Sequence, residues 1–209
     1  MAVSRTSGLR RVRLLAALAG VVALTQTAPA AEPVDIAVWV AHWPASYAVS
    51  GTKNEPTYLE AIDLQRRGDA FTIVGGAPAW ETRSTEAIAV SPAGALRHTI
   101  CPAGMNCNDR IAPSGFLAGA ALLGAARRGV PLGTATPVAY GRRTVLCVAG
   151  ERIGIAHPIL DPCFDLATGA VLAQRHRLSG AFDGPSLDPW SIEVRPGASP
   201  VLSEGRTGS

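Results

Sequence analysis

An α+β domain is the fold class that the sequence predicts: a mainly antiparallel β-sheet built from hairpins, with one α-helix over residues 114–128 packed on it and two disulfides. Three observations predict it. Short apolar runs alternate with turn residues, one Ala- and Leu-rich segment is nearly free of β-branched residues, and four cysteines follow the N-terminal segment. Alternating short runs are typical of half-buried strands, whereas a longer run without β-branching is typical of a helix.

The first thirty residues have the composition of a cleaved signal peptide. Four arginines precede eleven apolar residues (14–24), and Ala28-Pro29-Ala30 supplies the small residues of an A-x-A cleavage site. The apolar run spans about half of a hydrocarbon core that needs roughly 20 residues, so a membrane anchor is disfavoured. We therefore expect cleavage after Ala30, a periplasmic or secreted location, and no stable membrane insertion after cleavage.

Removal of this segment changes the charge of the chain. Four of the 19 Lys and Arg residues precede Ala31, which leaves 15 against 16 acids and a net charge of about −1. The remaining basic residues are scattered in short pairs, without the basic stripe typical of a nucleic-acid partner, so none is expected. The excess of Arg over Lys is typical of GC-rich bacterial coding sequences. We expect one globular domain over residues 31–195 and a disordered Pro-, Gly- and Ser-rich tail over 196–209.

The strands are expected in order along this domain. Apolar residues at 34, 36, 38 and 40 alternate with their neighbours, which predicts a strand that Pro44 ends, and residues 45–57 are expected to be a loop. Four hairpins should follow, centred on turn residues. They pair 58–65 with 70–74, 86–90 with 95–100, 144–148 with 152–156, and 163–164 with 170–178. A last strand is expected over 190–194.

The expected helix over 114–128 has recognisable ends. Ser114 can cap its start, and Gly129 and Pro131 follow its last turn. Glycines at 115, 119 and 124 lower its intrinsic propensity by about 1 kcal/mol each relative to alanine. Such a smooth face predicts that the helix packs closely against the sheet.

The four cysteines are expected to form two structural disulfides, because an even number in an exported chain is typical of a disulfide framework. Among the three possible connectivities we favour Cys101 with Cys107 and Cys147 with Cys163. The first pair closes a short loop, and the second joins an expected strand to the chain after Pro162.

The stretch from His98 to Cys107 also contains ligands that suit Cu(I): a histidine, two thiols and Met105. Its five intervening residues differ from the C-x-x-C spacing of thioredoxin-like sites, and it has no C-x-x-C-H haem motif. Zinc would need thiols kept reduced, in a spacing that fits no zinc ribbon. We therefore expect no metal and no cofactor, with copper handling through His98 and Met105 as an alternative.

One group of side chains is a candidate ligand site. If the hairpins pair as expected, basic residues gather across the sheet into a local anion-binding patch: Arg152, His157, Arg175, His176 and Arg177. A solvated polar face is the competing interpretation. The tryptophans, at 39, 43, 80 and 190, fall near expected strand ends, where they can close the core or line a cleft; we favour the core.

Catalytic residues are not expected, because no coherent catalytic set stands out; G-x-S-x-G, for example, is absent. The sequence is most consistent with an exported, periplasmic, disulfide-stabilised binding or accessory protein without catalytic activity, whose partner is a protein or a small molecule. A periplasmic hydrolase with a dispersed active site is the first alternative, and the copper-handling protein is the second.

Overall fold

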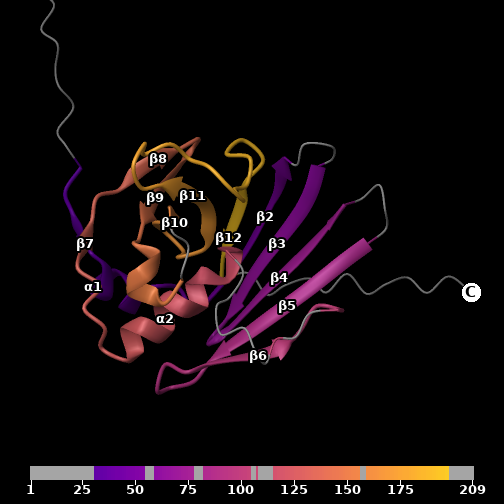
Figure 1. Ribbon diagram of the computed structural model, residues 1–209, viewed down its shortest axis with the longest axis horizontal. Helices are drawn as coiled ribbons and strands as arrows, with labels where there is room; N and C mark the ends of the chain where they lie inside the picture. Colours follow the sequence, from indigo (N-terminus) through magenta and orange to yellow (C-terminus); the bar gives the residue numbers. More distant parts are fainter. Residues whose placement is uncertain are drawn as a thin grey trace, which may run out of the picture. The chain divides into compact units, whose positions relative to one another are not determined.

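Two antiparallel sheets and a buried helix form the computed structural model, which describes residues 31–54, 59–77, 82–104, 107, 115–155 and 159–197 (Figure 1). The larger sheet has six strands in the order β12-β2-β3-β4-β5-β6, and the smaller has four in the order β11-β10-β9-β8. A short antiparallel pair joins β1 (Val34–Asp35) to β7 (Thr134–Ala135). The predicted α+β class, mainly antiparallel with two disulfides, is confirmed, although the helix and hairpin details differ.

The six-stranded sheet is formed largely by consecutive hairpins. Its strands are β2 (Ser46–Asn54), β3 (Leu59–Arg67), β4 (Ala70–Ala77), β5 (Thr82–Val90), β6 (Leu96–Ile100) and β12 (Glu193–Pro196). The expected hairpins β3–β4 and β5–β6 are both present. Each turns at a glycine with positive φ, Gly68 at +56° and Gly94 at +81°, a conformation that a Cβ disfavours.

The prediction of a loop over residues 45–57 was wrong for residues 46–54. This segment has few large apolar residues, but Tyr47 and Val49 are buried on one face of β2. All nine residues of β2 pair with β3, and its other edge pairs with β12. The neighbouring strands therefore impose a strand on a segment whose own pattern is weak. The last strand lies at 193–196 rather than at 190–194.

Beyond Asp35 the chain forms a helix where the strand was expected to continue. Helix α1 (Ile36–Ala41) follows β1, and the Asp35 carboxylate caps it by accepting a hydrogen bond from the Val38 amide at 2.9 Å. Its buried residues are Ile36, Trp39 and Val40, at helical spacing, whereas Val38 is 57% exposed. The strand prediction failed because it placed Trp39 on the solvent side of an alternating pattern.

The four-stranded sheet contains β8 (Val138–Tyr140), β9 (Arg143–Cys147), β10 (Leu160–Asp165) and β11 (Val171–His176). The expected β10–β11 hairpin is present. The expected strand 152–156 is wrong within its described part. A 3-10 helix, η3 (Gly150–Ile153), ends at Gly154, which has a φ of +78°, and β9 pairs instead with β8 and β10.

The long helix begins later than expected. A 3-10 turn, η2 (Gly115–Leu117), leads into α2 (Ala118–Arg127), whose N-cap Leu117 makes no side-chain cap; Ser114 lies outside the described residues. Helix α2 is buried from Ala118 to Ala125 and contacts β4, β5 and β6 of the six-stranded sheet. A Cβ on Gly124 would lie 2.7 Å from the Gly94 carbonyl oxygen, so the predicted close packing of this helix is confirmed.

Both disulfides pair as expected. Cys101 and Cys107 close a short loop after β6, with their Cα atoms 5.9 Å apart. Cys147 on β9 lies directly opposite Cys163 on β10 and is bonded to it. Cys163 is fully buried, so the second disulfide forms part of the core of the four-stranded sheet.

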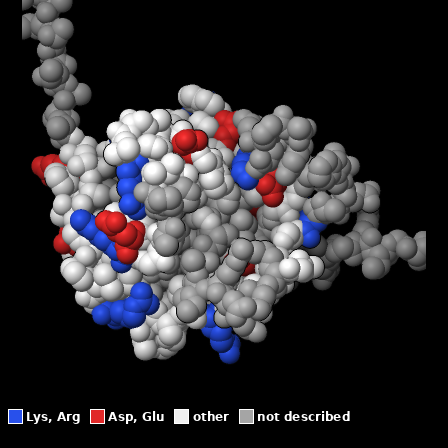
Figure 2. Space-filling view, viewed as in Figure 1, with Lys and Arg blue, Asp and Glu red and all other residues white. Residues whose placement is uncertain are grey.

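The remaining organisation bears on where a ligand could bind. No helix within the described ranges is long and apolar enough to cross a membrane. Pro196 is the last residue of β12, whereas residues 198–209 of the expected tail, and the whole expected signal peptide, lie outside the described residues. Where Figure 2 colours charged side chains, basic and acidic residues are interspersed on that face. A candidate site must therefore be sought in local contacts.

Candidate functional site

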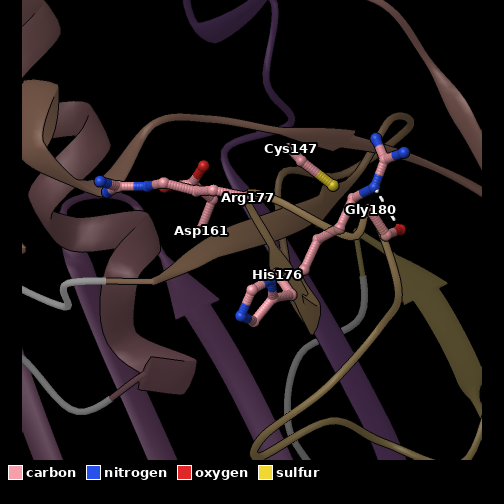
Figure 3. Close-up of a pocket in the computed structure, with 6 residues that line it drawn as sticks. Cys147, Asp161, His176, Arg177 and Gly180 are labelled. Atoms are coloured by element: carbon pink, nitrogen blue, oxygen red, sulfur yellow. Dashed lines mark hydrogen bonds and ion pairs between the residues drawn. The ribbon is translucent and has the colours of Figure 1, made fainter.

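A pocket of about 240 Å³ opens on the four-stranded sheet, beside the turn that follows β11. Six residues line it: Cys147, Asp161, Arg175, His176, Arg177 and Gly180. Figure 3 shows them as sticks. Its volume is below the roughly 300–1,000 Å³ of sites for drug-sized molecules. The cavity therefore suits a small ligand or one chemical group of a larger one.

Strand register explains why these residues meet. Asp161 on β10 is directly opposite Arg175 on β11, and Cys163, two residues along β10, is opposite Cys147 on β9. Because alternate residues of a strand share a face, Asp161, Arg175 and the Cys147–Cys163 disulfide lie on one face of the sheet. Cys147 of this disulfide thus lines the pocket together with a carboxylate and a guanidinium.

The charge of Arg177 is neutralised by two carboxylates. Its Nε donates to Oδ1 of Asp161 at 2.8 Å, and its Nη1 lies 3.5 Å from Oε2 of Glu151. The same Asp161 oxygen accepts the amide of Gly150 at 2.9 Å, so β10, β11 and η3 are linked at one point. In Figure 3, Arg177 extends toward Asp161 and away from Cys147. Arg177 therefore mainly holds one wall of the pocket.

Arg175 is placed differently. Its Nε donates to the carbonyl oxygen of Gly180 at 2.7 Å, which fixes the guanidinium against the turn after β11. Gly180 has a φ of +71°, and a Cβ there would lie 3.0 Å from an Nη atom of Arg175. No ion pair among the described residues includes Arg175. The Nη groups of Arg175 are thus hydrogen-bond donors in the pocket, and no carboxylate in the described part of the chain forms an ion pair with them.

His176 stabilises the turn that holds Arg175. Its Nδ1 lies 3.2 Å from both the Leu178 and Ser179 amides, which donate to it, and the Gly180 amide donates to the His176 carbonyl at 2.8 Å. An accepting Nδ1 places the ring proton on Nε2 in the neutral form. Figure 3 shows the His176 ring and the Asp161 carboxylate pointing away from each other, so they do not form an acid–base pair here.

The structure brings together three of the five predicted patch residues. Arg175, His176 and Arg177 all line the pocket. Arg152 does not: its Nη1 donates to the carbonyl oxygen of Leu132 at 2.6 Å. His157 lies outside the described residues. Arg152 is absent from the lining because residues 150–153 form η3 rather than the strand that the patch prediction assumed.

Three lining residues were not identified from the sequence as part of a site: Asp161, Gly180 and Cys147. Asp161-Pro162 precedes a cysteine, a pattern that also suits an ordinary turn, so the sequence offers no local signal for its role. Gly180 in Ser179-Gly180 does signal a turn after β11. The register that sets Asp161 opposite Arg175 depends on the pairing of β10 with β11, which the hairpin prediction implied but did not count residue by residue.

The residues of the copper hypothesis are arranged as follows. The two sulfur atoms of Cys101 and Cys107 are bonded to each other, and Nε2 of His98 lies 3.0 Å from Oε1 of Glu86. Met105 lies outside the described residues. Within the described ranges, no group of three or more His, Cys, Asp or Glu side chains is placed to hold a metal ion.

Comparisons of the chain with protein-family models, curated proteins and solved structures find no match. The geometry of this pocket is therefore the guide to function.

Proposed function

We propose that this chain is an exported, disulfide-stabilised binding protein without catalytic activity, and that it holds a small anionic group against Arg175. The observation that carries the proposal is the contrast between the two neighbouring arginines. Arg177 contacts Asp161 and Glu151, whereas Nε of Arg175 is fixed by the Gly180 carbonyl and its Nη edge contacts no carboxylate in the described chain. A guanidinium oriented in this way is pre-organised for a carboxylate or phosphate group.

The proposed site is built on rigid supports. The disulfide fixes β9 to β10, Asp161 joins β10 to both Arg177 and η3, and His176 holds the turn that carries Gly180. A preformed site of this kind loses little conformational entropy when a ligand binds. A binding role suits this arrangement better than a hydrolase, because the lining histidine faces the turn rather than a carboxylate or hydroxyl.

Calorimetric titration of phosphate, sulfate and acetate into the purified chain tests the proposal. Charge-assisted hydrogen bonds contribute about 1.5–3 kcal/mol, so Arg175→Gln should weaken binding of the preferred anion by roughly 10- to 100-fold. Arg97→Gln is the matched control, because Arg97 is exposed on β6 and its replacement removes the same charge at a different place. Equal affinities for the parent chain and Arg175→Gln would refute the Arg175 site.

Two further measurements test the other parts of the proposal. The intact mass of the chain recovered from the periplasm or medium should equal that of a chain beginning at Ala31 if the signal peptide is removed as expected. Hydrolysis of p-nitrophenyl acetate or p-nitrophenyl phosphate by the chain, if it is lost when His176 is replaced, would instead favour the hydrolase alternative. The non-catalytic binding proposal would then fail even if anions bind Arg175.

A further inference from the structure

A second surface feature is independent of the pocket: Trp190 is 70% exposed, although it is the largest apolar side chain type. The tryptophans were expected to close the core, and Trp39 and Trp43 do so, with their rings 5.0 Å apart. Trp80 lies outside the described residues. Trp190 therefore departs from the prediction in a specific way, and its position needs a reason of its own.

The turn that carries Trp190 is firmly held. The Trp190 amide donates to Oδ1 of Asp188 at 3.0 Å, and the Asp188 amide donates to the Thr52 carbonyl at 2.7 Å. The Thr52 amide in turn donates to Oγ of Ser191 at 2.9 Å. These bonds fix residues 188–191 to β2 on both sides of the tryptophan. The exposed indole is thus presented by a rigid turn rather than by a loose loop.

Arg142 is placed next to this indole by a second set of contacts. The Tyr140 hydroxyl donates to the Leu187 carbonyl, which ties β8 to the same loop. Gly141 has a φ of +59°, and a Cβ there would lie 2.7 Å from Cβ and O of Pro189, so the β8–β9 turn packs directly against the residue before Trp190. The Arg142 guanidinium carbon then lies 5.9 Å from the centre of the Trp190 ring.

The charges around this pair favour an acidic ligand. None of the ion pairs among the described residues includes Arg142, whereas Arg143 lies 3.9 Å from the buried carboxylate of Asp165. Asp188 is the nearest acid in sequence; its Oδ1 accepts the Trp190 amide, and none of the ion pairs among the described residues joins it to Arg142. The exposed surface therefore combines one apolar ring with one cation that no carboxylate of the described chain neutralises.

We propose that Arg142 and Trp190 form a docking site for an acidic segment of a protein partner. A carboxylate of that segment pairs with the Arg142 guanidinium, and an adjacent apolar side chain covers the Trp190 ring. Tryptophan and arginine are the residue types most enriched among those that dominate the binding energy of protein interfaces. Because the backbone that carries Trp190 is already held in place, docking orders little additional chain.

Selection of a displayed library of random 12-residue peptides on the immobilised chain tests this proposal. Selected peptides should be enriched in Asp and Glu next to aromatic or aliphatic residues. A selected peptide should bind Trp190→Ala at least tenfold more weakly and Arg142→Gln at least fivefold more weakly than the parent. Leu178→Ala is the matched control, because Leu178 is 89% exposed elsewhere, and Arg175→Gln separates this surface from the pocket; both should bind within twofold of the parent.

The outcomes that overturn the proposal are distinct. They are selection of basic or uncharged peptides, no enrichment over the starting library, or binding that Trp190→Ala retains. Chito-oligosaccharide binding that quenches Trp190 fluorescence, without any acidic peptide, would assign the surface to carbohydrate instead. Because Trp190 and Arg142 are exposed, both variants should fold, and circular dichroism checks this directly.

Discussion

Replacement of Gly124 by alanine tests how closely helix α2 packs on the six-stranded sheet. In an unconstrained helix this change stabilises by about 1 kcal/mol, because alanine has the higher helix propensity. Here the new Cβ would lie 2.7 Å from the Gly94 carbonyl oxygen and 3.3 Å from Cδ2 of Leu96. The Gly94 oxygen belongs to the backbone of a tight turn, so it cannot rotate away, and the helix must shift.

Overpacking costs about 1–3 kcal/mol, and a 2.7 Å contact with a backbone atom belongs to the upper part of that range, about 2–3 kcal/mol. After the helix-propensity gain of about 1 kcal/mol, the net loss of stability should be about 1–2 kcal/mol. For a domain of this size that lowers the Tm by roughly 2–8 °C, measurable by differential scanning calorimetry. Gly119→Ala is the internal control, because its nearest neighbour, the buried Phe71 ring at 3.1 Å, need move by only a few tenths of an ångström, so its loss of stability should be smaller. A Gly124→Ala variant as stable as the parent would refute the close packing of α2 against the β5–β6 turn.

Three further predictions concern the disulfides and one surface ion pair. Under mild dithiothreitol the exposed Cys101–Cys107 bond should be reduced before Cys147–Cys163, whose Cys163 is fully buried; mass spectrometry after alkylation distinguishes the pairs, and equal rates would contradict this. Replacing both Cys147 and Cys163 by serine should destabilise the chain by about 3 kcal/mol, as measured by urea unfolding. The hydrogen bond from Arg127 lowers the pKa of Asp69, so this carboxylate stabilises the fold above its unfolded pKa of about 3.9 and loses that contribution as pH falls through the folded value. Asp69→Asn should therefore cost up to about 1 kcal/mol at pH 7 and much less near pH 3 in the same assay; a difference that persists at pH 3 would show that the charge is not the cause.

Local patterns predicted the elements that the chain specifies over short distances. The hairpins β3–β4, β5–β6 and β10–β11 each combine short apolar runs with a glycine turn, and both signals act within about ten residues. The same local pattern gave a wrong prediction at Ile36, Trp39 and Val40, whose spacing also fits one helical face. There the Asp35 cap and burial against the core decide between two patterns that the sequence alone leaves open.

The candidate site could be predicted only in part, for a similar reason. Arg175, His176 and Arg177 are consecutive, so their clustering is local. The difference between the two arginines depends on Glu151, which is distant in sequence from Arg177 and reaches it only because η3 folds back over β10. Tertiary pairing of this kind determines which charge remains available, and composition or periodicity does not encode it.

The position of β12 has a consequence for how the six-stranded sheet is completed. This strand lies near the end of the described chain, yet it pairs with β2, the first strand of that sheet along the sequence. During synthesis from the N-terminus, the edge of β2 therefore stays unpaired until residues 193–196 have been made, and an exposed edge can pair with another molecule. Once β12 is in place, its own outer edge carries exposed Glu193, Arg195 and Pro196. Charged residues and proline oppose the addition of another strand, so the last strand to arrive also limits growth of the sheet into aggregates.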